Sequence, residues 1–362
     1  MLRLMSLLLI GLLVLTSSIT LAQDISVLYC GDLSETDCQL LNNSLVSLPN
    51  LHSAQIELES QLWQGDAPPI EYMRISGFLR GTVNLNMFQS SVGYYDFLRN
   101  LDADLTITAP RDLADDPSDL ISVNFMLIDE IFYIDLANLQ PILNDPTLPA
   151  WGYYDLSANL DATIENRRAR EEASEPVEPF ATGLDANQMI DVLGLEFTQQ
   201  FIHVTRTDAD DSAWFETRTD LAGLYADPTF QETFREQIVQ QEGSRLTSPV
   251  TDEQLDHLQQ AIAALFPEPV VTLRLGVDLE TGFLNSVYSW RPDEWIFTVS
   301  AMLRSEDINR SWLSAIAFTL NLTDLNADRS VTAPEGAEPF AVNTLRTVEP
   351  IWAVLPLASI VR

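Results

Sequence analysis

The two cysteines of the chain, Cys30 and Cys38, lie in the short stretch YCGDLSETDC. A redox pair or a zinc knuckle needs closer spacing or further ligands. A cysteine that carries a lipid lies at a signal-peptide cleavage site behind small residues, whereas Cys30 follows the bulky Tyr29. The pair is therefore predicted to form a structural disulfide across the start of a helix. Closing so short a loop should stabilise the folded state by about 2.5 kcal/mol.

The three histidines, His52, His203 and His257, are scattered along the chain. None has a second histidine or a cysteine at ligand spacing, so no metal site is predicted from them. The sequence contains no G-x-S-x-G elbow, no H-E-x-x-H and no glycine loop for phosphate. With 53 acidic residues, a pair of neighbouring carboxylates has no diagnostic value. We therefore predict a protein without catalytic residues and without a cofactor.

The stretch DLNADRSVTAPE (324–335) has oxygen ligands at the spacing of a calcium loop. The spaced residues are Asp324, Asn326, Asp328, Ser330 and Glu335. Arg329, however, stands where the sharp turn of such a loop needs glycine. The favoured interpretation is a solvated connection after a strand, with calcium association kept as an alternative.

The charge of the chain limits its partners. Its 53 acidic residues face 19 basic ones, which gives a net charge of −34, and all the basic residues are arginine. Such a surface repels nucleic acid and anionic headgroups, so no nucleic-acid partner is expected. The lack of lysine excludes Schiff-base chemistry. Because 46% of the residues are hydrophobic, the chain is expected to fold rather than to be disordered.

The N-terminus has the pattern of a secretory signal peptide. Arg3 precedes an apolar run, and the small-residue site TLA ends at Ala22. Residues 1–22 are therefore predicted to be removed on export, which leaves a secreted or extracytoplasmic protein with no stable membrane anchor. The apolar C-terminal tail, 346–362, is too short and too interrupted by proline to span a membrane.

The rest of the chain favours an α+β fold with a curved, half-barrel-like antiparallel sheet of about 11–12 strands and helices packed on its concave side. Residues 23–47 would form the disulfide-stapled helix, from about Asp32 with an Asp32/Glu35 capping box. Residues 48–345 would form the main domain, because period-two runs separated by short turns dominate there. The charged stretch 165–183 is predicted to be an exposed acidic insertion. A short echo relates 101–112 to 325–336 and leaves a duplicated half open.

One face of this sheet is a candidate ligand site. Apolar residues alternate with polar ones in 73–87 and 120–128, and two amphipathic helices follow near 227–241 and 251–266. The face would either be filled by these helices as a core or stay partly open for an apolar, lipid-like molecule. The expected sheet lining is Ile75, Leu79, Val83, Val123, Phe125 and Leu127, and the expected plugging residues are Phe230, Phe234, Leu258 and Ile262.

The chain resembles the LolA/LppX-like superfamily of bacterial envelope lipid and lipoprotein carriers. The resemblance rests on VDLETGFLNSV (277–287), on FTLNLTDLNADRSVTAP (318–334) and on the order of helix, long strands and mid-chain helices. It covers roughly 33–340 and implies a half-barrel of about eleven strands, helices that cap its hollow, and a carrier that shields acyl chains without catalytic residues. The chain departs from LppX-type members by having no lipobox and from the family by the insertion at 165–183. The alternative function is an extracellular structural or interaction protein with a closed core.

Overall fold

The computed structural model describes residues 29–64, 68–81, 95, 97–112, 116–173, 189–190, 193–209, 211–234, 251–292 and 314–341. The predicted signal peptide, Val83 and the tail 346–362 lie outside these residues. Among the described residues, no helix has both the length and the apolar character that a membrane crossing requires.

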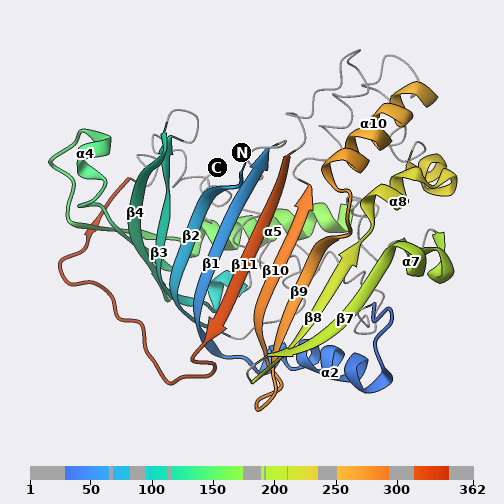
Figure 1. Ribbon diagram of the computed structural model, residues 1–362. Coiled ribbons are helices and arrows are strands. Elements are labelled where there is room, and N and C mark those ends of the chain that lie inside the picture. The colour runs from blue at the N-terminus through green and yellow to red at the C-terminus, as the bar shows by residue number, and fades with distance from the viewer. Residues whose placement is uncertain are drawn as a thin grey trace.

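The described strands form one sheet of twelve, in the order β12-β6-β5-β4-β3-β2-β1-β11-β10-β9-β8-β7. All neighbours are antiparallel except β12, which is parallel to β6. Two meanders, β1 to β6 and β7 to β11, meet where β1 pairs with β11 (Figure 1). The predicted α+β class with an antiparallel sheet is confirmed. The strands are β1 Ser53–Gln64, β2 Ile70–Arg80, β3 Asp102–Asp112, β4 Asp116–Ile128, β5 Ile131–Asp135, β6 Trp151–Asp155, β7 Ile202–Ala209, β8 Ser212–Thr219, β9 Val270–Asp278, β10 Leu284–Pro292, β11 Ser314–Thr323 and β12 Glu338–Pro339.

The helices lie in two groups. In Figure 1, α5 crosses behind the middle strands and α2 lies behind the lower ends of the last strands, while α7, α8 and α10 gather towards the β7 side of the sheet. Their bounds are α2 Glu35–Val46, the 3-10 turn η1 Leu48–Asn50, α4 Gln140–Leu143, α5 Ser157–Ala173, α7 Leu195–Phe201, α8 Leu221–Ala226 and α10 Asp252–Leu265. Residues 228–234 are also helical.

The two faces of the sheet differ in polarity, as expected for antiparallel strands with one buried side. On one face, here called the covered face, Ile75, Ile107 and Val123 lie opposite one another and are at most 1% exposed. The other, outer face carries polar pairs, both near these strands and further along the sheet on β8 and β9. These pairs are Glu216 with Arg274 (2.9 Å), Arg74 with Glu59 (2.9 Å) and Thr108 with Ser122 (2.8 Å).

Gly77 allows β2 to lie very close to β3. Its φ is +147°, and a Cβ built on it would lie 2.1 Å from the carbonyl oxygen of Asp104. A larger residue would therefore require the two strands to separate.

Three local predictions need correction. The first helix begins at Glu35 and its N-cap is Ser34, whose hydroxyl accepts a hydrogen bond from the Asp37 amide (3.2 Å), so the Asp32/Glu35 box does not form. The expected loop at 165–183 begins as helix, because α5 continues to Ala173. The echo is not structural: 102–112 is strand β3, whereas the described structure has no strand over 325–336.

Candidate functional site

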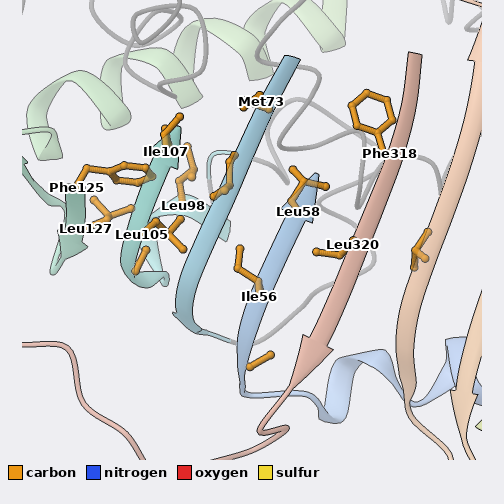
Figure 2. Packing of buried hydrophobic residues seen from close by; sticks show 14 of the residues in the cluster. Ile56, Leu58, Met73, Leu98, Leu105, Ile107, Phe125, Leu127, Phe318 and Leu320 are labelled. Atoms are coloured by element: carbon orange, nitrogen blue, oxygen red, sulfur yellow. The ribbon is translucent and has the colours of Figure 1, made fainter. Parts of the chain in front are cut away.

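The predicted sheet lining comes together on the covered face. Ile75 and Val123 flank Ile107, Phe125 lies opposite Leu105, and Leu79 and Leu127 flank Ala103. Ile75, Val123, Phe125 and Leu127 are 0–4% exposed, and Leu79 is partly buried. Figure 2 shows Phe125 and Leu127 of this set in one apolar cluster that continues to Leu58 and Phe318. The five described lining residues therefore share one surface.

Helix α5 contributes the apolar side chains Leu160 and Ile164 to this cluster. They follow Leu156 at intervals of four residues, which places all three on one side of a helix. Leu156 is 1% exposed, Leu160 is 0% exposed and Ile164 is 5% exposed. Beyond Ile164, the described side chains of α5 are exposed. The helix therefore joins the core of the sheet through one short apolar stripe near its start.

The start of α5 is capped by Asp155, the last residue of β6. One carboxylate oxygen of Asp155 accepts hydrogen bonds from the Ser157 amide (2.9 Å) and the Ser157 hydroxyl (2.6 Å). The Ser157 side chain first, and its amide second, hold the pKa of Asp155 below its usual 3.8. Since that pKa is depressed, the cap contributes stability above the unfolded-state pKa and loses it as pH falls through the folded-state value.

The same end of α5 is tied to the turn between β4 and β5. The Leu156 amide donates to the Glu130 carbonyl (2.9 Å). Arg99 forms ion pairs with Glu130 (3.2 Å) and with Asp161 of α5. The first turns of α5 are thus positioned by β6 and by this turn, both of which belong to the first meander.

The predicted plugging residues lie in a separate cluster. Phe230, Phe234, Leu258 and Ile262 are all buried, and they pack with Tyr225 of α8 rather than with the sheet lining. The ring centroids of Tyr225 and Phe230 are 5.0 Å apart, and those of Phe230 and Phe234 are 5.9 Å apart. This cluster also includes Trp290 of β10 and two alanines of β11. The structure therefore does not bring the two predicted sets of residues into one hollow.

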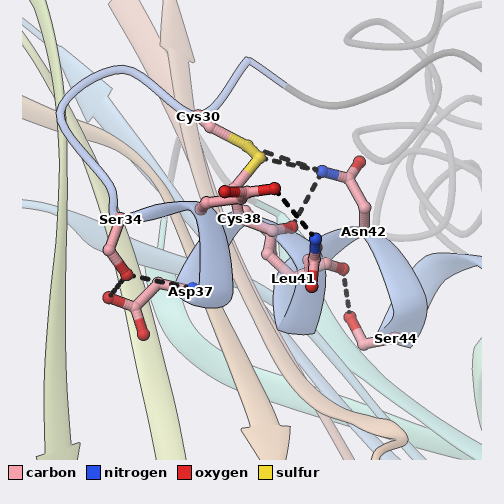
Figure 3. Close-up of a disulfide and its surroundings, with 9 residues drawn as sticks. Cys30, Ser34, Asp37, Cys38, Leu41, Asn42 and Ser44 are labelled. Atoms are coloured by element: carbon pink, nitrogen blue, oxygen red, sulfur yellow. Dashed lines mark hydrogen bonds between the residues drawn. A yellow bond between two sulfur atoms is a disulfide. The ribbon is translucent and has the colours of Figure 1, made fainter.

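The predicted disulfide between Cys30 and Cys38 is confirmed, with a Cα–Cα distance of 5.5 Å. Figure 3 shows the bond beside the first turns of α2, where the amide nitrogen of Asn42 lies 3.4 Å from each sulfur. Asn42 also donates to the carbonyl of Cys38 (2.9 Å). The staple thus fixes the segment before α2 to the helix itself.

The stapled segment is bound to the edge strand β7. The Tyr29 hydroxyl donates to the Ile202 carbonyl (3.1 Å), and Arg206 pairs with Asp37 of α2 (2.5 Å). Burial, and then the nearby Asp32, raises the pKa of Tyr29 to about 12. The Ser34 hydroxyl, followed by Arg206, lowers the pKa of Asp37. These contacts connect the first described residues with β7, the first strand of the second meander, at the edge of the sheet.

Replacing both cysteines by serine should lower the free energy of unfolding by about 2.5 kcal/mol, because the unfolded chain regains the freedom of a short loop. The measurement is urea denaturation of the Cys30→Ser/Cys38→Ser protein beside the oxidised parent. A reduced parent protein is the matched control and should unfold at the same urea concentration as the double variant. Equal midpoints for oxidised and reduced parent would contradict a stabilising disulfide.

Asn326, a candidate calcium ligand, has another role. Its side-chain oxygen accepts a hydrogen bond from the backbone amide of His52 (2.7 Å). Its side-chain nitrogen donates one to the backbone carbonyl of Asn50 (3.3 Å). The amide is thus engaged in fixing the chain after β11 to the chain before β1. In the part of the chain that the structure describes, no three His, Cys, Asp or Glu side chains gather in a group that could hold a metal ion.

The sequence reasoning missed the two side chains of α5, and that of Leu156 just before it, which meet the sheet. Their signal was the spacing of Leu156, Leu160 and Ile164, which lies within otherwise polar sequence. It also missed Phe340, which packs against the same cluster from beyond β11. Comparisons with protein-family models and with curated proteins gave no match for this chain.

Proposed function

We propose that this is an exported, non-enzymatic protein that binds an apolar or lipid-like molecule on the covered face of a half-barrel-like sheet, with α5 as a displaceable lid. The proposal depends on the contact between α5 and the covered face of the sheet, whose two sides differ in apolar area. The sheet presents a continuous apolar surface. Among the described side chains of α5, only Leu160 and Ile164 are buried against it, and Leu156, just before the helix, adds a third.

The energies favour an exchange between helix and ligand. Burying one leucine or isoleucine side chain contributes about 1.5–3 kcal/mol, so the three side chains contribute roughly 5–9 kcal/mol. An acyl chain of about sixteen carbons contributes about 0.8 kcal/mol per CH₂, or roughly 13 kcal/mol in total. A ligand of this kind would therefore outweigh the apolar contact that it displaces.

Two further observations support the proposal. The twelve strands of the described sheet agree in number with the half-barrel of about eleven that the LolA/LppX-like resemblance implies. The disulfide is compatible with the oxidising compartment that an exported protein reaches.

A second candidate is an extracellular structural or interaction protein with a closed core. It is favoured by the burial of the lining, since Ile75, Val123, Phe125 and Leu127 are at most 4% exposed. In that case α5 would be a permanent part of the core, and the acidic exterior would contact the partner.

Native mass spectrometry of the exported protein, purified without detergent, distinguishes the two candidates. For the carrier we expect an added mass that denaturation releases as an acyl lipid. For the closed-core protein we expect the mass of the bare polypeptide, unchanged after incubation with phosphatidylcholine vesicles.

The substitution Leu79→Asp should leave a folded protein that binds at least about fivefold less lipid. Leu79 is partly buried on the covered face, opposite Ala54 and Ala103, so a carboxylate there reaches water more readily than one at the centre of the face, yet opposes an apolar ligand. The control is Ser76→Asp, which adds the same charge to the outer face of the same strand. Lipid released from each variant is measured after denaturation. Equal loading of the two variants would place the ligand away from this face.

A further inference from the structure

The chain after β11 forms a strap, defined here as residues 324–340, which runs from β1 to β6. In Figure 1 it leaves the lower end of β11 and runs around the left-hand side of the sheet. Its first anchor lies at Ser53, the start of β1. The backbone amide of Asn326 donates a hydrogen bond to the Ser53 carbonyl (2.8 Å), and the Ser53 hydroxyl donates one to the Ala327 carbonyl (2.8 Å).

The strap meets the outer face of β1 to β3 through Arg329. Its guanidinium lies 5.1 Å from the ring centroid of Phe78, and it donates to the Gln55 side chain (3.3 Å). It also pairs with Asp104 (3.7 Å). Phe78 lies opposite Gln55 and Asp104 and therefore projects from the outer face. It is nevertheless only 1% exposed. Beyond Arg329, most strap residues up to 337 are exposed.

The far end of the strap crosses the edge of the sheet at Phe340. Strand β12 pairs with β6 over two residues only, and the Phe340 amide donates to the Tyr153 carbonyl (3.2 Å). A Cβ on Gly152 would lie 2.6 Å from the Phe340 ring and 2.7 Å from the Leu136 side chain. Gly152 lies opposite Ile134, a residue of the buried cluster of the covered face. The Phe340 ring therefore occupies the space that glycine leaves on the covered face.

We propose that the strap is a latch that keeps α5 on the covered face, with Phe340 as its catch. Strand β6 leads through Asp155 and Leu156 directly into α5, so whatever holds β6 also holds the start of the helix. The catch is a single ring beside Gly152 and Leu136. The strap is also held near Ser53, at Arg329, by the packing of Leu325 and by the two-residue pairing of β12 with β6. Release of the ring would leave β6 held by its pairing with β5 and would loosen the start of α5, without breaking the pairing of β1 to β4. This inference rests on the proposed function, since it describes how the proposed lid is regulated.

Hydrogen exchange of the ligand-free protein tests the latch. In Phe340→Ala, the amides of α5 from 160 to 166 should exchange about tenfold faster, while those of β1 to β3 keep the parent rate. Thr332→Ala, in the exposed part of the strap, should leave α5 at the parent rate. Faster exchange confined to the strap, with α5 unchanged, would overturn the proposal. Phe340→Leu, which keeps an apolar side chain, should exchange at an intermediate rate and remains informative if the alanine variant does not fold.

Gly152→Ala provides an independent test, because the added methyl group must displace the Phe340 ring or Leu136. If it expels the ring, α5 should exchange as fast as in Phe340→Ala, and the double variant should be no faster than either single variant. Additive acceleration in the double variant would show that the methyl group acts through Leu136 and would contradict the catch. Lipid loading of the same proteins is measured separately by native mass spectrometry. Faster α5 exchange without bound lipid would support the latch and reject the carrier function, whereas bound lipid with unchanged α5 exchange would do the reverse.

Discussion

Val123→Asp is expected to prevent folding, whereas Ser122→Asp, one residue earlier in β4, is expected to leave the protein folded. Val123 is 1% exposed on the covered face, opposite Ile107, which is fully buried. A carboxylate there would lose its hydration without gaining a partner, at a cost of several kcal/mol. That cost is comparable with the whole stability of an ordinary domain, about 5–15 kcal/mol. Ser122 is exposed on the outer face, where an added carboxylate stays hydrated, and its replacement alters the hydrogen bond to Thr108.

The measurement is the yield of folded protein after expression, followed by urea denaturation of the protein that is recovered. Ser122→Asp should unfold within about 1 kcal/mol of the parent, since a neutral hydrogen bond contributes about that much. A Val123→Asp protein with parent stability would mean that the centre of the covered face is open to water, and would contradict its burial.

The strands were predictable because each carries its own signal. In LISVNFMLI, alternate residues from Ile121 to Leu127 are apolar, and this period of two is what a sheet with one buried face requires. The turn after this strand, Asp129-Glu130, has positive φ at both residues, as a tight hairpin demands. Local sequence thus determines the strands and the turns between them.

The partner of the covered face was not predictable in the same way. Amphipathicity shows that a helix has an apolar side, but not which surface that side meets. The helices around Phe234 and Ile262 have the clearer apolar stripes, yet they pack with each other and with Tyr225. The apolar stripe of α5 consists of Leu160 and Ile164 together with Leu156 before it, and the position of the helix follows from its attachment to β6.

The N-terminal site was predictable in its chemistry but not in its details. Two cysteines eight positions apart beside a helix start were enough to predict the disulfide. The cap was misplaced by two residues because aspartate and serine are equally good N-caps, and Asp32 and Ser34 both precede the helix. The role of Gly152 was not visible from sequence, since the Phe340 ring that fills its space comes from 188 positions further along the chain.

Leu160→Ala should show whether α5 is a lid or a permanent part of the core. Leu160 is fully buried in the middle of the helix stripe, and removing such a side chain costs about 2–5 kcal/mol. If α5 detaches while the sheet stays folded, the lost contact lowers the free energy of this detachment alone. A local loss of about 3 kcal/mol would then accelerate exchange of the α5 amides by roughly 150-fold, while β1 to β3 would exchange at the parent rate.

If α5 is instead a permanent part of the core, the same loss lowers the free energy of unfolding as a whole, and the slowest amides of β1 to β3 accelerate together with those of α5. Asn166→Ala, an exposed position on the same helix, is the matched control and should change neither set of amides beyond the small difference in helix propensity. Urea denaturation provides the second measurement. A lid should leave the main transition near the parent midpoint, because the sheet unfolds from a state in which α5 has already detached. A shift of the main transition by the full cost of the missing side chain would establish the closed core and exclude displacement of α5 as the route to a ligand.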